Sequence, residues 1–250
     1  MYQISQLFKF PNLVHGFSVV DEGNMATLFS GQTADPDEIF VNRKKFLERL
    51  DINIDDCVGM WHQQSNKVGV VSKTKFEQFD FQKIAKLDGL ITNKKGRFLF
   101  MVVADCLSIV IYDPKKKVVG LIHAGWKGVD LEIPKVAVES LLKEYGCDPE
   151  DLIIGFGPVA RKDFFVKENP EQKDDLKWKE FVENDRKSDL YKIDFVGLAR
   201  KQLIDVGVKN SNIFDCDIDT IKNKRFFSHY RDKKAGVKDL GRFACVVGMR

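Results

Sequence analysis

Cys106 and His123 carry reactive side chains at the ends of neighbouring apolar segments of the sequence. Cys106 lies between the apolar runs 98–103 and 107–112, and His123 closes the next apolar run, 118–123. An imidazole beside a thiol can activate the thiol as a nucleophile. The same pair can instead bind zinc, with a third protein ligand and one position left open for water or substrate. The residue types therefore allow two chemistries at one place.

A third zinc ligand would have to come from His15, His62 or His229, the remaining histidines. His62 stands just before a predicted strand at 68–71, although a lone histidine there is also typical of a surface or core position. Four histidines in all are too few for a multicopper oxidase, which spreads many histidines over several copper sites.

The pairing of Cys106 with His123 depends on a hairpin. The polar segment 113–117, with Pro114 where a turn favours it, separates two apolar runs and predicts such a turn. If the turn is centred on Lys115, Cys106 lies opposite His123 or Ala124, and a shift of one residue would undo this register. Cysteine is often a small core residue, but a charged neighbour inside an apolar stretch, Asp105, costs free energy unless it is paired.

Two further segments could bind an anion. In 123–128 (HAGWKG), two glycines allow close backbone approach and Lys127 adds a positive charge, although an ordinary turn with Trp126 in the core would look the same. In 225–232, aromatic residues beside Arg231 could stack on a ring and hold phosphate or carboxylate. The alternative for that segment is a buried pair of phenylalanines with an Arg–Asp salt bridge.

The elements that would position these residues alternate irregularly. Helices are predicted at 37–50, 133–145 and 194–206, and strands at 68–71, 98–103, 107–112, 118–123, 153–156, 213–215 and 243–247. The charge-rich segment 168–189 is expected to be a surface helical segment. Irregular alternation together with a hairpin favours an α+β fold with mixed sheets.

Composition excludes several classes of protein. The 250 residues are 44% hydrophobic and 31% charged, which is not the composition of a disordered chain. A net charge of +3 does not indicate nucleic-acid binding, and no apolar run approaches the ~20 residues of a membrane span. No linker or signal peptide is evident, and the five cysteines lack CxxC spacing. We therefore expect one domain over 1–250, in the cytoplasm, with reduced thiols.

Several of these segments together resemble a known family, the YfiH-like "laccase domain" proteins. These proteins were formerly named multicopper polyphenol oxidases and are now regarded as purine nucleoside phosphorylases. The resemblance rests on DGLIT (88–92), ADCLSIVIYD (104–113), GLIHAGWKGV (120–129), Gly157-Pro158 and FFSHYRD…GR (226–242), and extends from His15 to Arg242.

The resemblance implies a fold, an activity and a site. The fold would be α+β, with stacked mixed sheets and helices on the outside, similar to a cysteine-hydrolase architecture. The activity would be phosphorolysis of adenosine, inosine and methylthioadenosine, together with adenosine deamination. The implied zinc site has His, Cys and His ligands, of which Cys106 and His123 match the family motifs. His62 is the candidate for the remaining ligand, and these three residues are also the candidate catalytic residues. The implied ligands are a purine nucleoside and phosphate rather than nucleic acid or membrane.

Candidate substrate-binding residues and alternatives follow from the same segments. Lys127 and Arg231 would hold phosphate, and Trp126 would stack on the purine. The family motif, however, places Gln64 at the first ligand position, and a neutral amide is a poor zinc ligand. There are therefore two alternatives. One is a metal-independent cysteine hydrolase with Cys106 as nucleophile and His123 as base, and the other is a non-catalytic ligand-binding protein.

Overall fold

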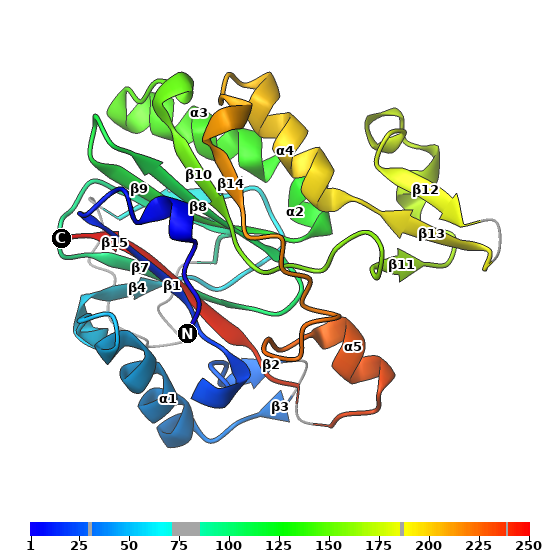
Figure 1. Cartoon of the computed structure of the whole chain (residues 1–250), viewed down its shortest axis with the longest axis horizontal. Helices are drawn as coiled ribbons and strands as arrows, with labels where there is room; N and C mark the ends of the chain where they lie inside the picture. The colour runs from blue at the N-terminus through cyan, green and yellow to red at the C-terminus, as the bar shows by residue number, and fades with distance from the viewer. Residues whose placement is uncertain (30–31, 72–85, 186–187, 239) are drawn as a thin grey trace.

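The computed structural model describes residues 1–29, 32–71, 86–185, 188–238 and 240–250. Its main elements form four stacked layers, with helices outside and two sheets between them (Figure 1). The upper helices are α2 (Trp126–Asp130), α3 (Ile133–Tyr145) and α4 (Phe195–Asp205), and the lower one is α1 (Pro36–Glu48). The predicted α+β fold with stacked mixed sheets is confirmed.

The six-stranded sheet lies under the upper helices and contains the hairpin of interest. Its order is β14 (Ile213–Asp215), β10 (Ile153–Phe156), β8 (Leu107–Asp113), β9 (Val118–Ala124), β6 (Gly89–Thr92) and β5 (Val68–Val70). The two outer pairs are parallel and the three inner pairs antiparallel, so the sheet is mixed.

The four-stranded sheet forms the next layer. Its order is β1 (Leu13–Phe17), β15 (Phe243–Met249), β7 (Phe98–Val103) and β4 (Cys57–Gly59). Smaller elements complete the fold: β2 (Leu28–Phe29) with β3 (Gln32–Thr33), the sheet of β11 (Val166–Lys167), β13 (Leu190–Ile193) and β12 (Val182–Asp185), and α5 (His229–Lys234).

One apolar cluster fills the space between each pair of layers. Along β8, Ile109 faces the helices and packs in the first cluster, whereas Val110 faces the other sheet and packs in the second. The third cluster joins the four-stranded sheet to α1 through Phe100 and Phe46. Because β8 is buried on both faces, its sequence is a continuous apolar run rather than an alternating one.

The helix ends agree with the sequence signals. Asp194 caps α4 by accepting a hydrogen bond of 2.8 Å from the backbone N–H of Gly197. Gly146 ends α3 with φ of 63°, a left-handed conformation that glycine adopts without strain. Among the described residues, no helix combines the length and apolar character needed to cross a membrane.

The prediction of a surface helical segment at 168–189 is wrong. The described part of this segment forms two short 3-10 turns and strand β12, which pairs with β13; together with β11 these strands make a lobe beside the main layers (Figure 1). Trp178 is fully buried, and its indole N–H donates to Asp130 Oδ1 over 2.8 Å. Trp178 therefore attaches the lobe to α2. The many charged residues around it favoured an exposed segment in the prediction.

Candidate active site

The β8–β9 hairpin brings Cys106 and His123 together. Its register pairs Ser108 with His123 and Leu107 with Ala124, one residue away from the predicted register. Cys106 therefore lies just beyond the ladder and beside Gly125, where an added Cβ would come within 3.1 Å of the Cys106 Sγ. The thiol and the imidazole meet at the open end of the hairpin.

The residue before Cys106 holds the turn that leads into β8. Asp105 adopts φ of 73°, an uncommon conformation for a residue with a side chain. Its buried carboxylate accepts hydrogen bonds from the Thr220 hydroxyl (2.6 Å) and from the backbone N–H of Tyr230 (2.7 Å). The charge of Asp105 is thus paired within its apolar surroundings. Its partners are the hydroxyl of Thr220 and the backbone amide of Tyr230, both far away in the sequence.

Asp88 orients His123 and organises the segment that carries His62. Its fully buried carboxylate lies 2.8 Å from His123 Nδ1 and accepts hydrogen bonds from the Ser65 hydroxyl and from the backbone N–H groups of residues 63–65. Burial alone would raise the pKa of Asp88, but the hydrogen bonds from His123 and Ser65 outweigh burial and hold it well below its usual value.

The environment of His123 favours its protonated form. Burial by itself lowers the pKa of His123, but the electrostatic and hydrogen-bond interactions with Cys106 and Asp88 outweigh burial and raise it to about 9. The three residues lie in the order Asp88, His123, Cys106. A carboxylate that orients an imidazole beside a thiol is the arrangement of a nucleophile, its base and an orienting group.

His62 stacks on His123. The two rings have centroids 3.9 Å apart and planes 5° from parallel. Burial and the positive charge of His123 lower the pKa of His62 well below its ordinary value, so His62 is neutral. Its Nε2 atom is buried and has no hydrogen-bond partner among the described residues.

The residues of the predicted zinc site do not fit a shared metal in this arrangement. The lone pair of an imidazole nitrogen lies in the ring plane, and the nearly parallel planes of His62 and His123 do not converge on one ion. Within the described residues, no group of three or more His, Cys, Asp or Glu side chains could hold a metal. Gln64, at the family's ligand position, has an exposed side chain at the cavity edge.

Of the two other histidines considered as ligands, His15 is not among the described residues of the cavity wall. His15 is buried on β1, where its Nε2 accepts a hydrogen bond of 2.8 Å from the backbone N–H of Ile4. His229 begins α5 and lines the same cavity as Cys106.

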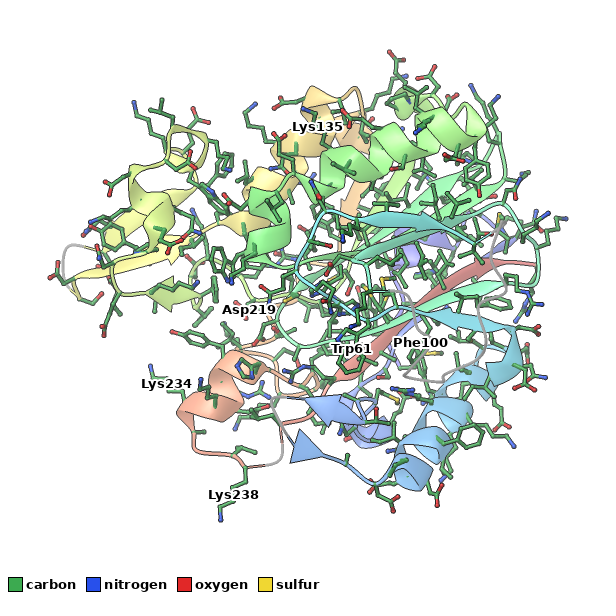
Figure 2. The ribbon with its side chains drawn as sticks, turned by 180° about the vertical axis from the view of Figure 1, so that it is seen from behind. Trp61, Phe100, Lys135, Asp219, Lys234 and Lys238 are labelled. Atoms are coloured by element: carbon green, nitrogen blue, oxygen red, sulfur yellow. The ribbon has the colours of Figure 1, made fainter. Side chains whose placement is uncertain are left out.

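A cavity of about 560 Å³ opens over Cys106 and His123. Aromatic residues form much of its wall: Trp61, Phe100, Trp126, Phe165, Phe195 and Tyr230. Three cations also line it: Arg43, Lys167 and Arg242. Trp61 and Phe100 lie near the middle of the molecule, while Lys135 of α3 and Lys234 of α5 lie on its outside (Figure 2). The cavity is therefore apolar with a few charged groups, as small-molecule sites usually are.

Arg242 is a cavity residue that the pattern analysis did not single out. Its side chain is buried, and its backbone N–H donates to Asn24 Oδ1 over 2.8 Å. Burial lowers the pKa of Arg242 to about 10, whereas the negative charges of Cys106 and Asp105 act in the opposite direction. The Gly-Arg pair near the C-terminus was the available signal, but it is too short to be specific by itself.

The predicted substrate-binding residues are separated by the fold. Trp126 lines the cavity, but Lys127 and Arg231 are not among the described residues of its wall. The Arg231 guanidinium donates to the carbonyls of Thr220 and Phe226 and pairs with Asp232. Arg231 therefore braces the loop before α5, as the salt-bridge alternative for this segment implied.

Comparison with known proteins places the chain in a family. Residues 15–250 match the family described as "Multi-copper polyphenol oxidoreductase laccase". The chain is 30% identical over 156 residues to the purine nucleoside phosphorylase LACC1 of Mus musculus, covering 59% of this chain and 34% of that protein. It is 29% identical over 207 residues to a purine nucleoside phosphorylase of Xylella fastidiosa, covering 78% of this chain and 74% of that protein.

Solved structures share the same fold. YlmD of Geobacillus stearothermophilus superposes with a TM-score of 0.82 at 25% identity, covering 96% of this chain and 93% of that one. The YfiH protein of Bacillus licheniformis gives a TM-score of 0.81 at 24% identity, covering 95% and 93%. The chain spans about a third of the mouse relative's length and about three quarters of the Xylella relative's. Because the family match covers nearly all of its residues, the protein belongs to the multi-copper polyphenol oxidoreductase laccase family.

Proposed function

We propose that this protein is a purine nucleoside phosphorylase. The observation that carries the proposal is the cavity lined by Cys106, His123 and aromatic residues, with Asp88 buried behind it and hydrogen-bonded to His123. Relatives named purine nucleoside phosphorylase support it.

The cavity suits a nucleoside in size and polarity. Its volume of about 560 Å³ lies within the ~300–1,000 Å³ of small-molecule sites. Its wall includes two buried polar atoms, Thr27 Oγ1 and His62 Nε2, that have no hydrogen-bond partner among the described residues. Because buried polar atoms are usually satisfied, these two would bind the heteroatoms of a ribose or a purine.

His123 would supply the proton that the leaving base requires. In phosphorolysis a phosphate oxygen bonds to C1′ of the ribose while the bond from C1′ to the purine nitrogen breaks. The departing purine takes the electron pair and a proton from His123 Nε2, and the attacking phosphate monoanion returns a proton to His123. Asp88 keeps the imidazole oriented and stabilises its positive charge throughout. The products are the free base and ribose 1-phosphate.

We propose phosphorolysis alone, without the deamination that the resemblance implies. Deamination at such a site would use a water bound to zinc between His62, Cys106 and His123, and the ring geometry does not bring these ligands to one ion. We also propose that the protein works in the cytoplasm. None of its five cysteines, all within the described ranges, forms a disulfide, which agrees with a reducing compartment.

The test is a product assay with purified protein, inosine or adenosine, and phosphate. We expect hypoxanthine or adenine together with ribose 1-phosphate by chromatography, dependent on added phosphate. Cys106→Ala and His123→Ala should lose this turnover, and Cys216→Ala, a half-buried thiol outside the cavity, should retain it. A wild-type protein that forms no ribose 1-phosphate from any purine nucleoside would exclude the proposal.

A cysteine hydrolase is the second candidate, favoured by the order Asp88, His123, Cys106. The thiolate would attack a carbonyl carbon, the alcohol or amine would leave with the proton of His123, and water would then hydrolyse the thioester. Mass spectrometry after brief incubation with p-nitrophenyl acetate distinguishes the candidates, because only the hydrolase accumulates an acyl group on Cys106 that turns over.

A further inference from the structure

Two lysines from different elements gather around one tryptophan in the wall of the cavity. The Nζ of Lys167, on β11, lies 3.9 Å from the ring centroid of Trp126. The Nζ of Lys127, on α2, lies 5.5 Å from the same ring. Both ammonium groups are close enough to be attracted by the ring quadrupole.

This arrangement concentrates positive charge. Among the described residues, neither Lys127 nor Lys167 forms a salt bridge with a carboxylate. Burial and the charge of Lys127 both lower the pKa of Lys167, and the charge of Glu171 compensates only in part. Two ammonium groups held together at unfavourable electrostatic energy would be stabilised by a bound anion.

The geometry also changes the expected role of Trp126. An ammonium 3.9 Å from the ring centroid covers the face that would otherwise be open for a purine. Trp126 therefore does not stack on the base with that face. It holds the Lys167 ammonium in place at the cavity wall.

The position of Lys167 is fixed by contacts of the lobe that carries it. Trp178 donates its indole N–H to Asp130, and Lys177 forms an ion pair with the same carboxylate over 2.8 Å. Asp130 ends α2, the short helix that begins at Trp126. The lobe and the tryptophan are thus attached to one another at both ends of α2.

Lys167 and Trp126 share a cavity with the reacting groups. Trp126 directly follows Gly125, whose backbone packs against the Cys106 Sγ. Lys167 and Trp126 line the same cavity as Cys106 and His123. An anion held by Lys167 would therefore lie in the same cavity as the thiol and the imidazole.

We propose that Lys167 and Lys127, arranged on Trp126, form the subsite that binds a phosphoryl group in this cavity. The role of this subsite in phosphorolysis rests on the proposed function, but the binding of a phosphoryl ligand to it can be measured without turnover. The phosphoryl group is either inorganic phosphate or the 5′-phosphate of a nucleotide, since both present the same oxygens to the ammonium groups. Lys167 replaces Arg231 in this role, because the Arg231 guanidinium is bonded elsewhere.

Calorimetric titration of the full chain tests the subsite. Inorganic phosphate, a purine nucleoside and its 5′-monophosphate are titrated separately into the wild type, Lys167→Met, Lys127→Met and the control Lys179→Met. Lys179 is an exposed lysine of the same lobe, away from the cavity wall. Melting temperatures of the four proteins verify that each is folded.

We expect Lys167→Met to raise the Kd of the phosphoryl ligand by ~10-fold or more, as loss of a charge-assisted contact does. Lys127→Met should have a smaller effect because this lysine is exposed, and Lys179→Met none. An effect on inorganic phosphate identifies the free anion as the ligand. An effect on the monophosphate alone identifies a nucleotide.

Two results would overturn the subsite: a folded Lys167→Met protein with the wild-type Kd, or a wild type that binds neither phosphoryl compound. The proposed function fails separately. If phosphate binding depends on Lys167 but no ribose 1-phosphate forms, the subsite stands and the phosphorylase assignment does not.

Discussion

The rings of His62 and His123 lie face to face, with centroids 3.9 Å apart. Burial and the positive charge of His123 both lower the pKa of His62, so His62 is neutral, whereas His123 is charged. Two imidazoles that would share a metal must instead point their nitrogens at a common centre. As they lie in this stack, His62 and His123 do not point their nitrogens at one ion.

Removal of metal should leave phosphorolysis unchanged. We expect protein dialysed against a chelator to keep its rate with inosine and phosphate, because His62 and His123 do not converge on one ion. Metal content by mass spectrometry is measured on the same samples. Stoichiometric zinc that is lost together with activity, and restores it on addition, would contradict this expectation.

Asp88→Asn should lower kcat by ~100-fold or more, since an amide neither fixes the same imidazole tautomer nor stabilises its charge. The matched variant is Ser65→Ala, which removes one donor to the same carboxylate and leaves the contact with His123. Steady-state rates of the two proteins are compared at equal folded fraction. Similar losses in both would show that Asp88 acts only through the 63–65 backbone.

Asp105→Asn should destabilise the chain by ~1–3 kcal/mol, because an amide cannot accept hydrogen bonds with both of its heteroatoms. The carboxylate now accepts from Thr220 and from the Tyr230 backbone, so the variant leaves one of these donors unsatisfied. Urea unfolding measures the change, with Asp163→Asn as an exposed control. An unfolding midpoint equal to the wild type would refute the bridging role.

His15 should make stability depend on pH in the mildly acidic range. Burial lowers the pKa of His15 from 6.5 to about 4, so the unfolded chain binds this proton more readily than the folded chain. Its contribution is complete above pH 6.5 and is lost as the pH falls toward about 4, a loss of about 3 kcal/mol.

The matched variant is His15→Gln, whose amide oxygen can accept from the Ile4 N–H but does not titrate. Denaturant unfolding of both proteins between pH 7 and pH 4 gives the comparison. We expect the wild type to lose more stability than the variant over this window. Parallel curves would mean that His15 titrates alike in both states.

Local patterns in the sequence were sufficient for most elements but not for the site. The boundaries of β7, α3 and β10 follow from apolar runs, a proline near a helix start and a glycine after its end. The hydrogen-bond partners of Asp105 lie more than a hundred positions away in the sequence, so no local pattern predicts them. Asp88 carried a usable signal, a charge directly before an apolar strand. The sequence around Lys167 contains no such signal, because Lys167 reaches Trp126 only through the fold of the lobe that carries it.

The turn at 113–117 sets the distance that the site requires. At a rise of ~3.3 Å per residue, β8 places this turn on the order of 20 Å from the thiol. An extra residue inserted there would slide one strand past the other and carry His123 away from Cys106, although nothing near the pocket had been altered. Loop length at the far end of the sheet thus determines how Cys106 and His123 align, and the loop should tolerate substitution far better than insertion or deletion.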